Sequence, residues 1–212
     1  MLQIHSFTFN PFQENTYLII NEQKLCWIVD PGMYDSNETN HFFKYIADNG
    51  LIPQAIINTH THIDHIFGVN EVINKFSIPF GVNAKDLPVL NAAAGSAMMF
   101  GLQFGESPKP TFYINDNELM KLGDEEIDVR FTPGHSPGSV VFYYAPGNWL
   151  IGGDVLFSGS IGRTDLPGGH HQTLINSIRS QLFNLPDETV VHSGHGPSTT
   201  IGEEKAHNPF LQ

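Results

Sequence analysis

One short segment restricts this chain more than any other: the sequence HTHIDH directly follows the apolar run QAIIN. That run, Gln54–Asn58, is typical of a short buried strand. Residues i and i+2 of an extended chain point the same way, so His60 and His62 can bind one ion together. The chain then turns, and Asp64 and His65 can face a second ion. Imidazoles and carboxylates are ligands of divalent metals, so we predict a metal site at the end of this strand.

Two further candidate ligands follow other predicted strands. His135 lies in TPGHSPGS after Ile127–Phe131, where glycines and prolines indicate a tight turn. Asp154 follows the apolar sequence WLIGG. A carboxylate beside a buried strand needs a partner, and two cations bridged by it would supply one.

The last candidate ligand lies in HSGHGPS, after the predicted strand Thr189–Val191. Both His192 and His195 are available there. We favour His195 because its small neighbours Gly194 and Gly196 leave room for it to approach an ion.

Hydrophobic patterning predicts strands and helices in two successive halves, as in a layered core of two sheets with helices outside. The length of 212 residues fits one domain. The predicted strands are Gln3–Phe9, Asn15–Asn21, Leu25–Asp30, Gln54–Asn58, Ile78–Val82, Thr111–Ile114, Glu118–Leu122, Ile127–Phe131, Ser139–Ala145, Asn148–Ile151 and Thr189–Val191. The predicted helices are Ser36–Asn49, Val69–Phe76, 85–99 and 171–183.

Charge and composition exclude several classes of partner. The formal net charge is −12 and no Lys or Arg run is present, which argues against nucleic acid. No apolar run approaches the roughly 20 residues of a membrane span. The first residues lack the pattern of a signal peptide, so we expect a cytoplasmic protein. The single cysteine, Cys26, excludes an intramolecular disulfide.

The metal motifs, together with NTYLI, IVDPG, GRTDLPGG and GHGPSTTIGEEKAHNP, resemble the metallo-β-lactamase superfamily. The resemblance is strongest to the short single-domain bacterial members of its glyoxalase II-like branch. It implies an α+β fold, a four-layer αββα sandwich with the metal site at one edge of the two sheets. It also implies the grouping of the ligands: His60, His62 and His135 for one metal, Asp64, His65 and His195 for the second, and Asp154 bridging both.

The resemblance further implies a metal-dependent hydrolase that uses a metal-bound hydroxide. The expected substrate is a small thioester or ester of the S-lactoylglutathione type. We expect two divalent ions, with Zn²⁺ preferred and Fe or Mn open. Asp64 would orient the hydroxide and take up its proton. The oligomeric state is open, and a homo-oligomer is compatible with the sequence.

Several residues near the ligands have expected supporting roles. Asp30, Thr59, Thr61 and Asp165 are candidates for hydrogen bonds to the imidazoles. Arg163 could bind a substrate carboxylate or order a ligand, or it could form a structural clamp with Asp165. We expect the remaining histidines to be packing or surface residues: His5, His41, His170, His171, His192 and His207. The apolar stretch Ala92–Phe104 could pack in the core, roof the site or pair with another subunit.

Alternative functions remain open at this point. Persulfide dioxygenases resemble the chain at the cluster and at GRTD, and would hold a single iron through His60, His135 and Asp154. A metal-binding relative without turnover is the second alternative. β-Lactam hydrolysis is not expected, because Cys26 is not placed at the second metal site as in the best-known class. The helical C-terminal domain that helps glyoxalase II bind glutathione is absent from residues 1–212.

Overall fold

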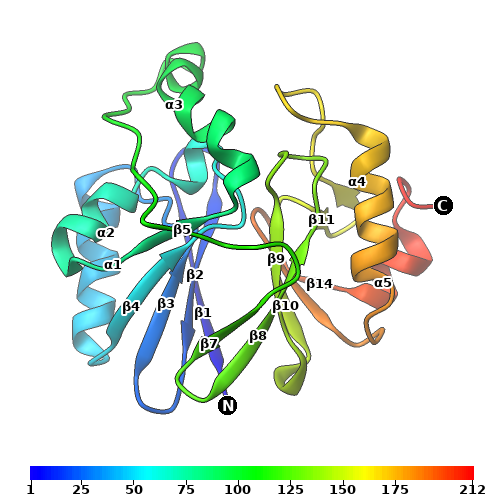
Figure 1. Cartoon of the computed structure of the whole chain (residues 1–212), viewed down its shortest axis with the longest axis horizontal. Coiled ribbons are helices and arrows are strands. Elements are labelled where there is room, and N and C mark those ends of the chain that lie inside the picture. The colour runs from blue at the N-terminus through cyan, green and yellow to red at the C-terminus, as the bar shows by residue number, and fades with distance from the viewer.

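Two mixed β-sheets lie face to face in the computed structural model, which describes residues 1–212 (Figure 1). The first sheet has the order β1-β2-β3-β4-β5-β6. Strands β1 to β3 pair antiparallel, and β3 to β6 pair parallel. The strands are β1 (Gln3–Phe9), β2 (Glu14–Ile20), β3 (Leu25–Val29), β4 (Ile52–Ile57), β5 (Phe80–Val82) and β6 (Phe112–Tyr113).

The second sheet has the order β14-β13-β10-β9-β8-β7. Strand β10 pairs parallel with β13, and the other neighbours pair antiparallel. Its strands are β7 (Leu119–Leu122), β8 (Glu125–Phe131), β9 (Val140–Tyr144), β10 (Trp149–Gly153), β13 (Val190–Ser193) and β14 (Thr199–Thr200). A separate antiparallel ribbon consists of β11 (Leu156–Phe157) and β12 (Ser160–Ile161).

Side-chain alternation explains why the sheets stack. In β2, Tyr17 and Ile19 lie in the hydrophobic cluster between the two sheets, whereas Leu18 faces the cluster beneath the outer helices. In β9, Phe142 faces the inter-sheet cluster and Val141 faces outward. Both sheets therefore bury both faces, which produces three hydrophobic clusters between four layers.

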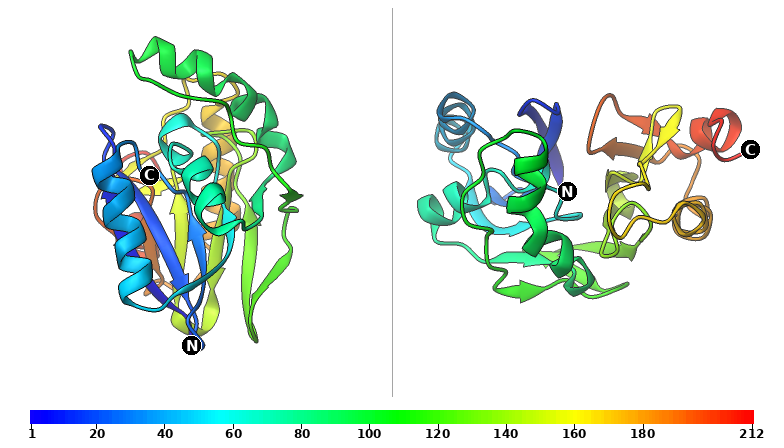
Figure 2. Two further views of the ribbon diagram at one scale, coloured as in Figure 1. Left: turned by 90° about the vertical axis from the view of Figure 1, so that its left-hand side faces the viewer. Right: turned by 90° about the horizontal axis from the view of Figure 1, so that it is seen from above.

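Helices cover the outer faces of the two sheets, as the view from above shows (Figure 2). Helices α1 and α2 pack on the first sheet, α4 and α5 on the second, and α3 extends over the edge where β4 and β10 end. The helices are α1 (Ser36–Asp48), α2 (Val69–Phe76), α3 (Leu87–Met99), α4 (His171–Ser177) and α5 (Ile201–His207). None of them combines the length and the apolar character needed to span a bilayer. The predicted αββα sandwich is confirmed.

The C-terminal half departs from the predicted elements in its shortest parts. The predicted helix 171–183 is α4 followed by a wider helical turn over Ile178–Leu182. Neither the β11–β12 ribbon nor helix α5 was predicted. Two-residue strands carry no alternation to detect, and α5 is only seven residues long. A sequence signal for α5 exists, because Thr200 precedes the helix and threonine is a favoured N-cap residue. In the structure the Thr200 side chain accepts a hydrogen bond from the backbone N–H of Glu203.

Candidate metal centre

Seven predicted ligand side chains converge at one edge of the two sheets. Strands β4, β10 and β13 end at this edge, and the β8–β9 loop lies beside them. They are His60 and His62 after β4, Asp64 and His65 in the 3-10 turn Ile63–His65, His135 in the loop, Asp154 after β10 and His195 after β13. Parallel pairing of β10 with β13 brings the carboxyl ends of those two strands together. The strand ends therefore meet as predicted.

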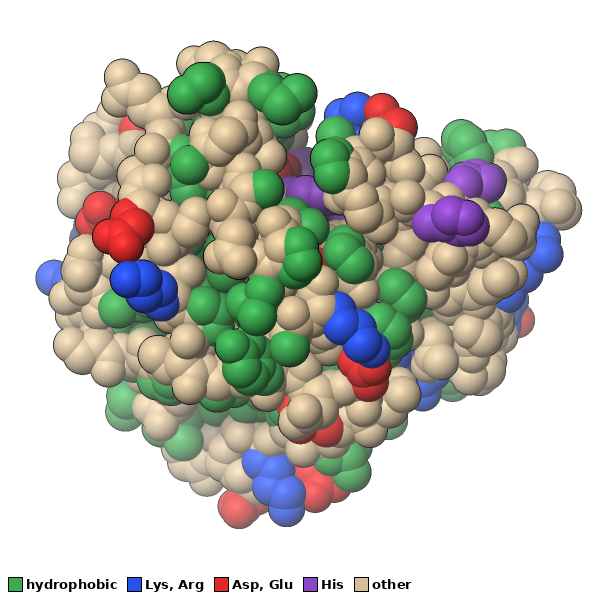
Figure 3. Space-filling view, turned by 45° about the horizontal axis from the view of Figure 1, so that its top comes forward, with side chains coloured by type: hydrophobic (Ala, Val, Ile, Leu, Met, Phe, Trp, Pro, Cys, Tyr) green, Lys and Arg blue, Asp and Glu red, His purple; other side chains and the backbone are tan.

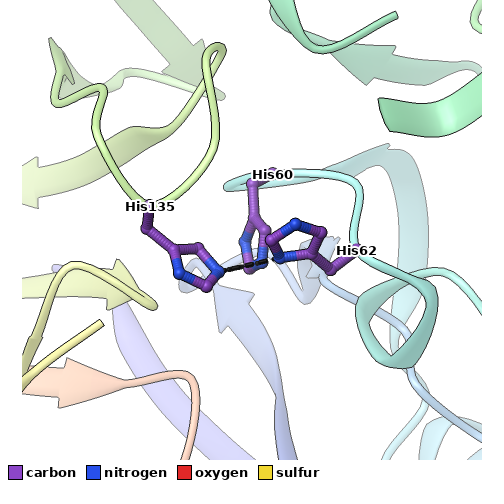
Figure 4. A group of neighbouring side chains, drawn as sticks. All are labelled: His60, His62 and His135. Atoms are coloured by element: carbon purple, nitrogen blue, oxygen red, sulfur yellow. Dashed lines mark hydrogen bonds between the residues drawn. The ribbon is translucent and has the colours of Figure 1, made fainter. Parts of the chain in front are cut away.

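Three imidazoles form the first group (Figure 4). Nδ1 of His62 lies 2.8 Å from Nε2 of His135, which lies 3.2 Å from Nε2 of His60. The rings of His60 and His62 come from one loop and point toward His135 on the facing loop. Three nitrogens aimed at one point are a donor set for a single divalent cation.

Asp64, His65 and His195 form the second group. Nε2 of His195 lies 3.2 Å from Oδ2 of Asp64, and Nε2 of His65 lies 3.8 Å from the same oxygen. Asp154 lies between the groups: its Oδ2 is 3.5 Å from Nε2 of both His135 and His195. This placement suits a carboxylate shared by two cations.

Hydrogen bonds behind the first group determine which ring nitrogens carry a hydrogen. Nδ1 of His135 lies 2.7 Å from the carbonyl oxygen of Arg163, which can only accept, so Nε2 of the neutral ring presents a lone pair. Nδ1 of His60 lies 3.1 Å from the Thr59 hydroxyl, whose hydrogen is donated to Asp30 Oδ2 at 2.5 Å. Nδ1 of His60 therefore donates as well. Two Nε2 lone pairs then face each other at 3.2 Å, which a bound cation would stabilise.

The Nδ1 hydrogens of the second group also point out of the cluster. His65 donates its Nδ1 hydrogen to Asp30 Oδ2 at 3.0 Å, and His195 donates to the carbonyl oxygen of Phe12 at 3.0 Å. Nε2 of His65 and Oδ1 of Asp154 are buried and have no hydrogen-bond partner. Buried polar atoms without partners are rare in native proteins. A divalent cation would satisfy both atoms, so the residues present fit two metal ions.

Two imidazoles of the first group differ in protonation from the two of the second. Burial lowers the pKa of His60 well below its usual range and lowers the pKa of His62 to about 3, so both rings are neutral at pH 7. Burial also opposes charge on His195, but hydrogen bonds to the neighbouring carboxylates outweigh it and raise its pKa to about 10. The pKa of His65 is likewise raised well above its usual value by the same carboxylates, against the effect of burial. In the metal-free protein, protons on these rings offset the negative charge of the second group.

Asp30 and Thr59 contact the imidazoles from behind, as predicted, but Thr61 does not. Asp30 accepts from the amide and the hydroxyl of Thr59 at 2.7 and 2.5 Å, and it also holds His65. The polar groups of Thr61 bond a carboxylate outside the cluster. Its amide and hydroxyl bond Oδ2 of Asp86 instead, at 2.5 and 2.7 Å.

Asp86 is a buried residue near the site that no sequence motif indicated. One oxygen of its carboxylate accepts the two hydrogen bonds from Thr61, and the other accepts from the Ser136 hydroxyl and from the Gly138 amide at 2.9 Å. It thereby joins the loop of His60 and His62 to the loop of His135. In the sequence, an acidic residue before an apolar helix looks like an ordinary helix cap. Its carboxylate makes no capping bond, however.

Two other buried polar residues near the cluster were also missed. The Asn58 side-chain amide donates to the carbonyl oxygens of His60 and His65 at 3.2 and 2.8 Å, which shapes the loop between them. Glu14 is fully buried, and its Oε1 lies 3.9 Å from Nδ1 of His65. Burial raises the pKa of Glu14 well above its usual value. Neither residue belongs to a motif, so only the folded chain reveals them.

Structure places His195, not His192, in the cluster. His192 bonds a serine hydroxyl at 3.0 Å outside it. A Cβ on Gly194 would lie 2.2 Å from Oδ1 of Asp154, so a larger residue at this position would collide with a candidate ligand. Gly196 has open space around it, and its φ of +71° is the feature that suits glycine.

Arg163 and Asp165 form an ion pair at the surface rather than two separate parts of the site. Nε and Nη2 of Arg163 donate to the two Asp165 oxygens, each at 2.7 Å. The side chains are 54% and 68% exposed. The prediction that Asp165 supports an imidazole is therefore corrected: its carboxylate bonds the guanidinium. The segment orders His135 through the Arg163 carbonyl oxygen instead.

A cavity of about 620 Å³ opens in front of the cluster. Figure 3 shows histidine side chains at the floor of a hollow bordered by hydrophobic side chains. Helix α3 has two of the three roles suggested for the 92–104 stretch: Ala92 and Ser96 line the cavity, whereas Ala93 and Ala97 pack in the core. The volume is within the range of small-molecule sites.

Comparison with known protein families gives a match to the metallo-beta-lactamase superfamily over residues 9–195. A probable metallo-hydrolase, YqgX of Bacillus subtilis, is 42% identical over 95% of this chain and 93% of its own length. The hydroxyacylglutathione hydrolase GloC of Haemophilus influenzae is 35% identical over 99% of this chain and 98% of its own length.

Solved structures resemble the chain over its whole length. The crystal structure of BLEG-1 B3 metallo-beta-lactamase has a TM-score of 0.91 and 39% identity, covering 99% of this chain and all of that one. The structure of TTHA1623 in a di-iron-bound form has a TM-score of 0.88 and 38% identity, covering 98% and 100% of the two chains.

Proposed function

Because this chain belongs to the metallo-beta-lactamase superfamily, we propose that it is a metal-dependent hydrolase of thioesters of the S-lactoylglutathione type. The observation that carries the proposal is the convergence of seven ligand side chains into two adjoining groups on the floor of a cavity. The name of the H. influenzae relative supports the thioester class.

The donor set would hold two divalent ions, with Zn²⁺ as our first choice and Fe or Mn as alternatives. The di-iron form of a relative supports the number of two and keeps iron in consideration. When bound, such ions supply Lewis acidity, which lowers the pKa of water and polarises a carbonyl group. The first ion would be held by His60, His62 and His135, the second by Asp64, His65 and His195, and both by Asp154.

We assign the proton of the attacking water to Asp64. Its carboxylate lines the cavity beside Nε2 of His195. Burial opposes its charge, but the nearby positive charge of His65 and the His195 hydrogen bond lower its pKa. The carboxylate is therefore ionised at neutral pH and can orient a water molecule, and we propose that it also takes up the proton released on attack. Water oxygen joins the carbonyl carbon, the C–S bond breaks, and the sulfur takes a proton to leave as a thiol.

Elemental analysis paired with an S-lactoylglutathione assay tests this proposal. We expect about two metal ions per chain and turnover that depends on them. His62→Ala should lose metal and activity while the chain stays folded by circular dichroism. Retained turnover with unchanged metal content in this variant would exclude the scheme.

The persulfide dioxygenase alternative makes a different prediction for the same preparation. It requires one iron per chain, held by His60, His135 and Asp154, and oxygen consumption with glutathione persulfide. Oxygen uptake by anaerobically purified, iron-loaded protein distinguishes it from hydrolysis. A fully loaded protein inactive toward both substrates would favour a metal-binding relative without turnover.

β-Lactam hydrolysis returns as a second candidate because of one observation. The solved structure of BLEG-1 B3 metallo-beta-lactamase is 39% identical to this chain over nearly all of its length. The lack of a cysteine ligand counts against only one class of such enzymes, and Cys26 is buried in β3. A chromogenic cephalosporin in the same assay tests this candidate, and turnover comparable to that of the thioester would support it.

A further inference from the structure

The cavity in front of the metal centre has one wall built largely from helix α3 and the β1–β2 turn. Val89 and Ala92 of α3 line it, together with Phe100 after the helix and Phe12 from the turn. The rings of Phe12 and Phe100 pack edge to face with their centroids 5.4 Å apart. This contact joins the turn that holds His195 to the end of α3, so the wall continues from the metal centre to the rim.

The opposite wall is also apolar. It comprises Phe157 and Ile161 of the β11–β12 ribbon, with Leu166 and Pro167 from the following loop and Pro137 beside the first metal group. Phe157 packs against the His195 ring at 6.3 Å between centroids. A substrate whose carbonyl reaches the metal centre therefore extends its arms between two hydrophobic surfaces.

Away from the metal centre, the cavity lining offers little positive charge to an anionic substrate. Apart from the metal-centre histidines, the only cationic lining residue is Arg163, and its Nε and Nη2 donors are both held by Asp165. Ser96 and Ser160 are the uncharged polar residues of the lining. The whole chain has a formal net charge of −12. A glutathione thioester brings two carboxylates to this surface, and no lining Lys or unpaired Arg is available to bind them.

We infer that the cavity selects thioesters with uncharged, apolar arms over thioesters of glutathione. This inference rests on the proposed thioester hydrolysis, and it replaces the glutathione arm of the proposed substrate with an uncharged, apolar one. Burial between the two walls removes apolar arms from water, which lowers the free energy of binding. Glutathione carboxylates would instead lose hydration without a compensating ion pair.

Competing thioesters test the inference on the full chain loaded with zinc, and in parallel with iron. The substrates are S-hexanoyl-N-acetylcysteamine, S-acetyl-N-acetylcysteamine and S-lactoylglutathione. We expect kcat/KM to fall in that order, with the hexanoyl ester at least about tenfold above the acetyl ester. Higher kcat/KM for S-lactoylglutathione than for both neutral esters would overturn the inference while leaving thioester hydrolysis in place. No turnover of any of the three would instead contradict the proposed function.

A matched pair of variants tests whether the α3 wall sets this preference. Ala92 and Ala94 are both exposed on α3, but only Ala92 lines the cavity. Ala92→Lys should raise kcat/KM for S-lactoylglutathione relative to the hexanoyl ester by about fivefold or more, through pairing with a carboxylate. Ala94→Lys should leave the ratio unchanged. Equal ratios in the two variants, at equal metal content, would refute a role for this wall in selection.

Discussion

Four imidazoles of the cluster share one hydrogen-bonding arrangement. His60, His65, His135 and His195 each direct Nδ1 to an oxygen outside the cluster and turn Nε2 inward. The outer acceptors are a threonine hydroxyl, a carboxylate and two backbone carbonyls. Such contacts set the tautomer and the orientation of a ligating ring. The metal centre is thus prepared by residues that would not touch the metals.

Asp154 is the residue whose loss should affect both metals. Asp154→Asn keeps the size of the side chain but removes the charge that faces His135 and His195 at 3.5 Å. We expect metal content to fall to one ion per chain or fewer and kcat/KM to fall by more than about 100-fold. Mass spectrometry for metals and the thioester assay measure both. His192→Ala, outside the cluster, is the control and should behave as the wild type.

Proton release should distinguish the two metal groups. His60 and His62 have lowered pKa values and are neutral at pH 7, whereas the pKa of His195 is about 10 and that of His65 is raised. An ion entering the second group must therefore displace protons. Its affinity should rise at least about tenfold per pH unit between pH 6 and 8.

Calorimetry of metal binding in two buffers of different ionisation enthalpy measures those protons. The ion of the first group should release fewer protons than the ion of the second group. The raised pKa of His195 also has a stability consequence for the metal-free protein. Its contribution is fully present below pH 6.5, the usual imidazole value, and is lost as the pH rises toward 10. Equal proton release for both ions would contradict these assignments.

At the scale of elements, the site depends on how separate loops are joined. Asp86, at the start of α3, connects the loop after β4 to the β8–β9 loop through Thr61, Ser136 and Gly138. All four groups that it binds are donors, which matches an acceptor-only carboxylate. The same helix lines the cavity, so the substrate wall and the first metal group share this anchor.

Asp86→Asn should loosen that junction, because the amide nitrogen of asparagine is a donor and would face the donor groups that the carboxylate now accepts from. We expect about 1 to 3 kcal/mol lower stability, from buried groups left unpaired. Affinity for the first ion should fall about 10- to 100-fold. Thermal unfolding of the metal-free protein and competition with a chelating dye measure the two effects. Asp116→Asn is the control, since Asp116 bonds Asn83 and Lys85 without contacting either ligand loop.

At the scale of the whole molecule, we expect the core to be independent of the metals. Three hydrophobic clusters lie between and outside the two sheets, and the seven ligands lie at the sheet edge, where strands end. We therefore expect folding to bring the ligands together before any ion binds, and metal binding to add stability by mass action.

Removal of the metals should leave a folded protein that melts at a lower temperature. With each metal at about 100 times its Kd, each ion contributes about 2.7 kcal/mol, and the two together contribute about 5.4 kcal/mol. For a chain of this size that corresponds to a decrease of roughly 10 to 20 °C in Tm after chelation of both ions. Scanning calorimetry with and without chelator measures the change, and re-addition of zinc is the control. A chain that unfolds completely on chelation at 25 °C would contradict an independent core.

Local sequence was sufficient for the longer elements and for the set of candidate ligands that the structure brings together. HTHIDH after an apolar strand predicts that His60 and His62 face the same way, because residues i and i+2 of an extended chain do so. The apolar runs 15–21 and 139–145 likewise predict buried strands, and the structure has β2 and β9 there, each in a different sheet. The role of the seven residues as metal ligands stays a prediction, and so do the cytoplasmic location and the absence of nucleic-acid partners.

Only the tertiary structure decided which side chains support the ligands. Thr61 and Asp165 are close to ligands in sequence, yet they bond Asp86 and Arg163, whereas Asp86 bonds a loop 50 residues away. A hydrogen bond depends on the position of atoms contributed by another segment, and no local pattern encodes that position. The same holds for the cavity, because its apolar walls come from α3 and the β11–β12 ribbon, which meet only when the two sheets pack.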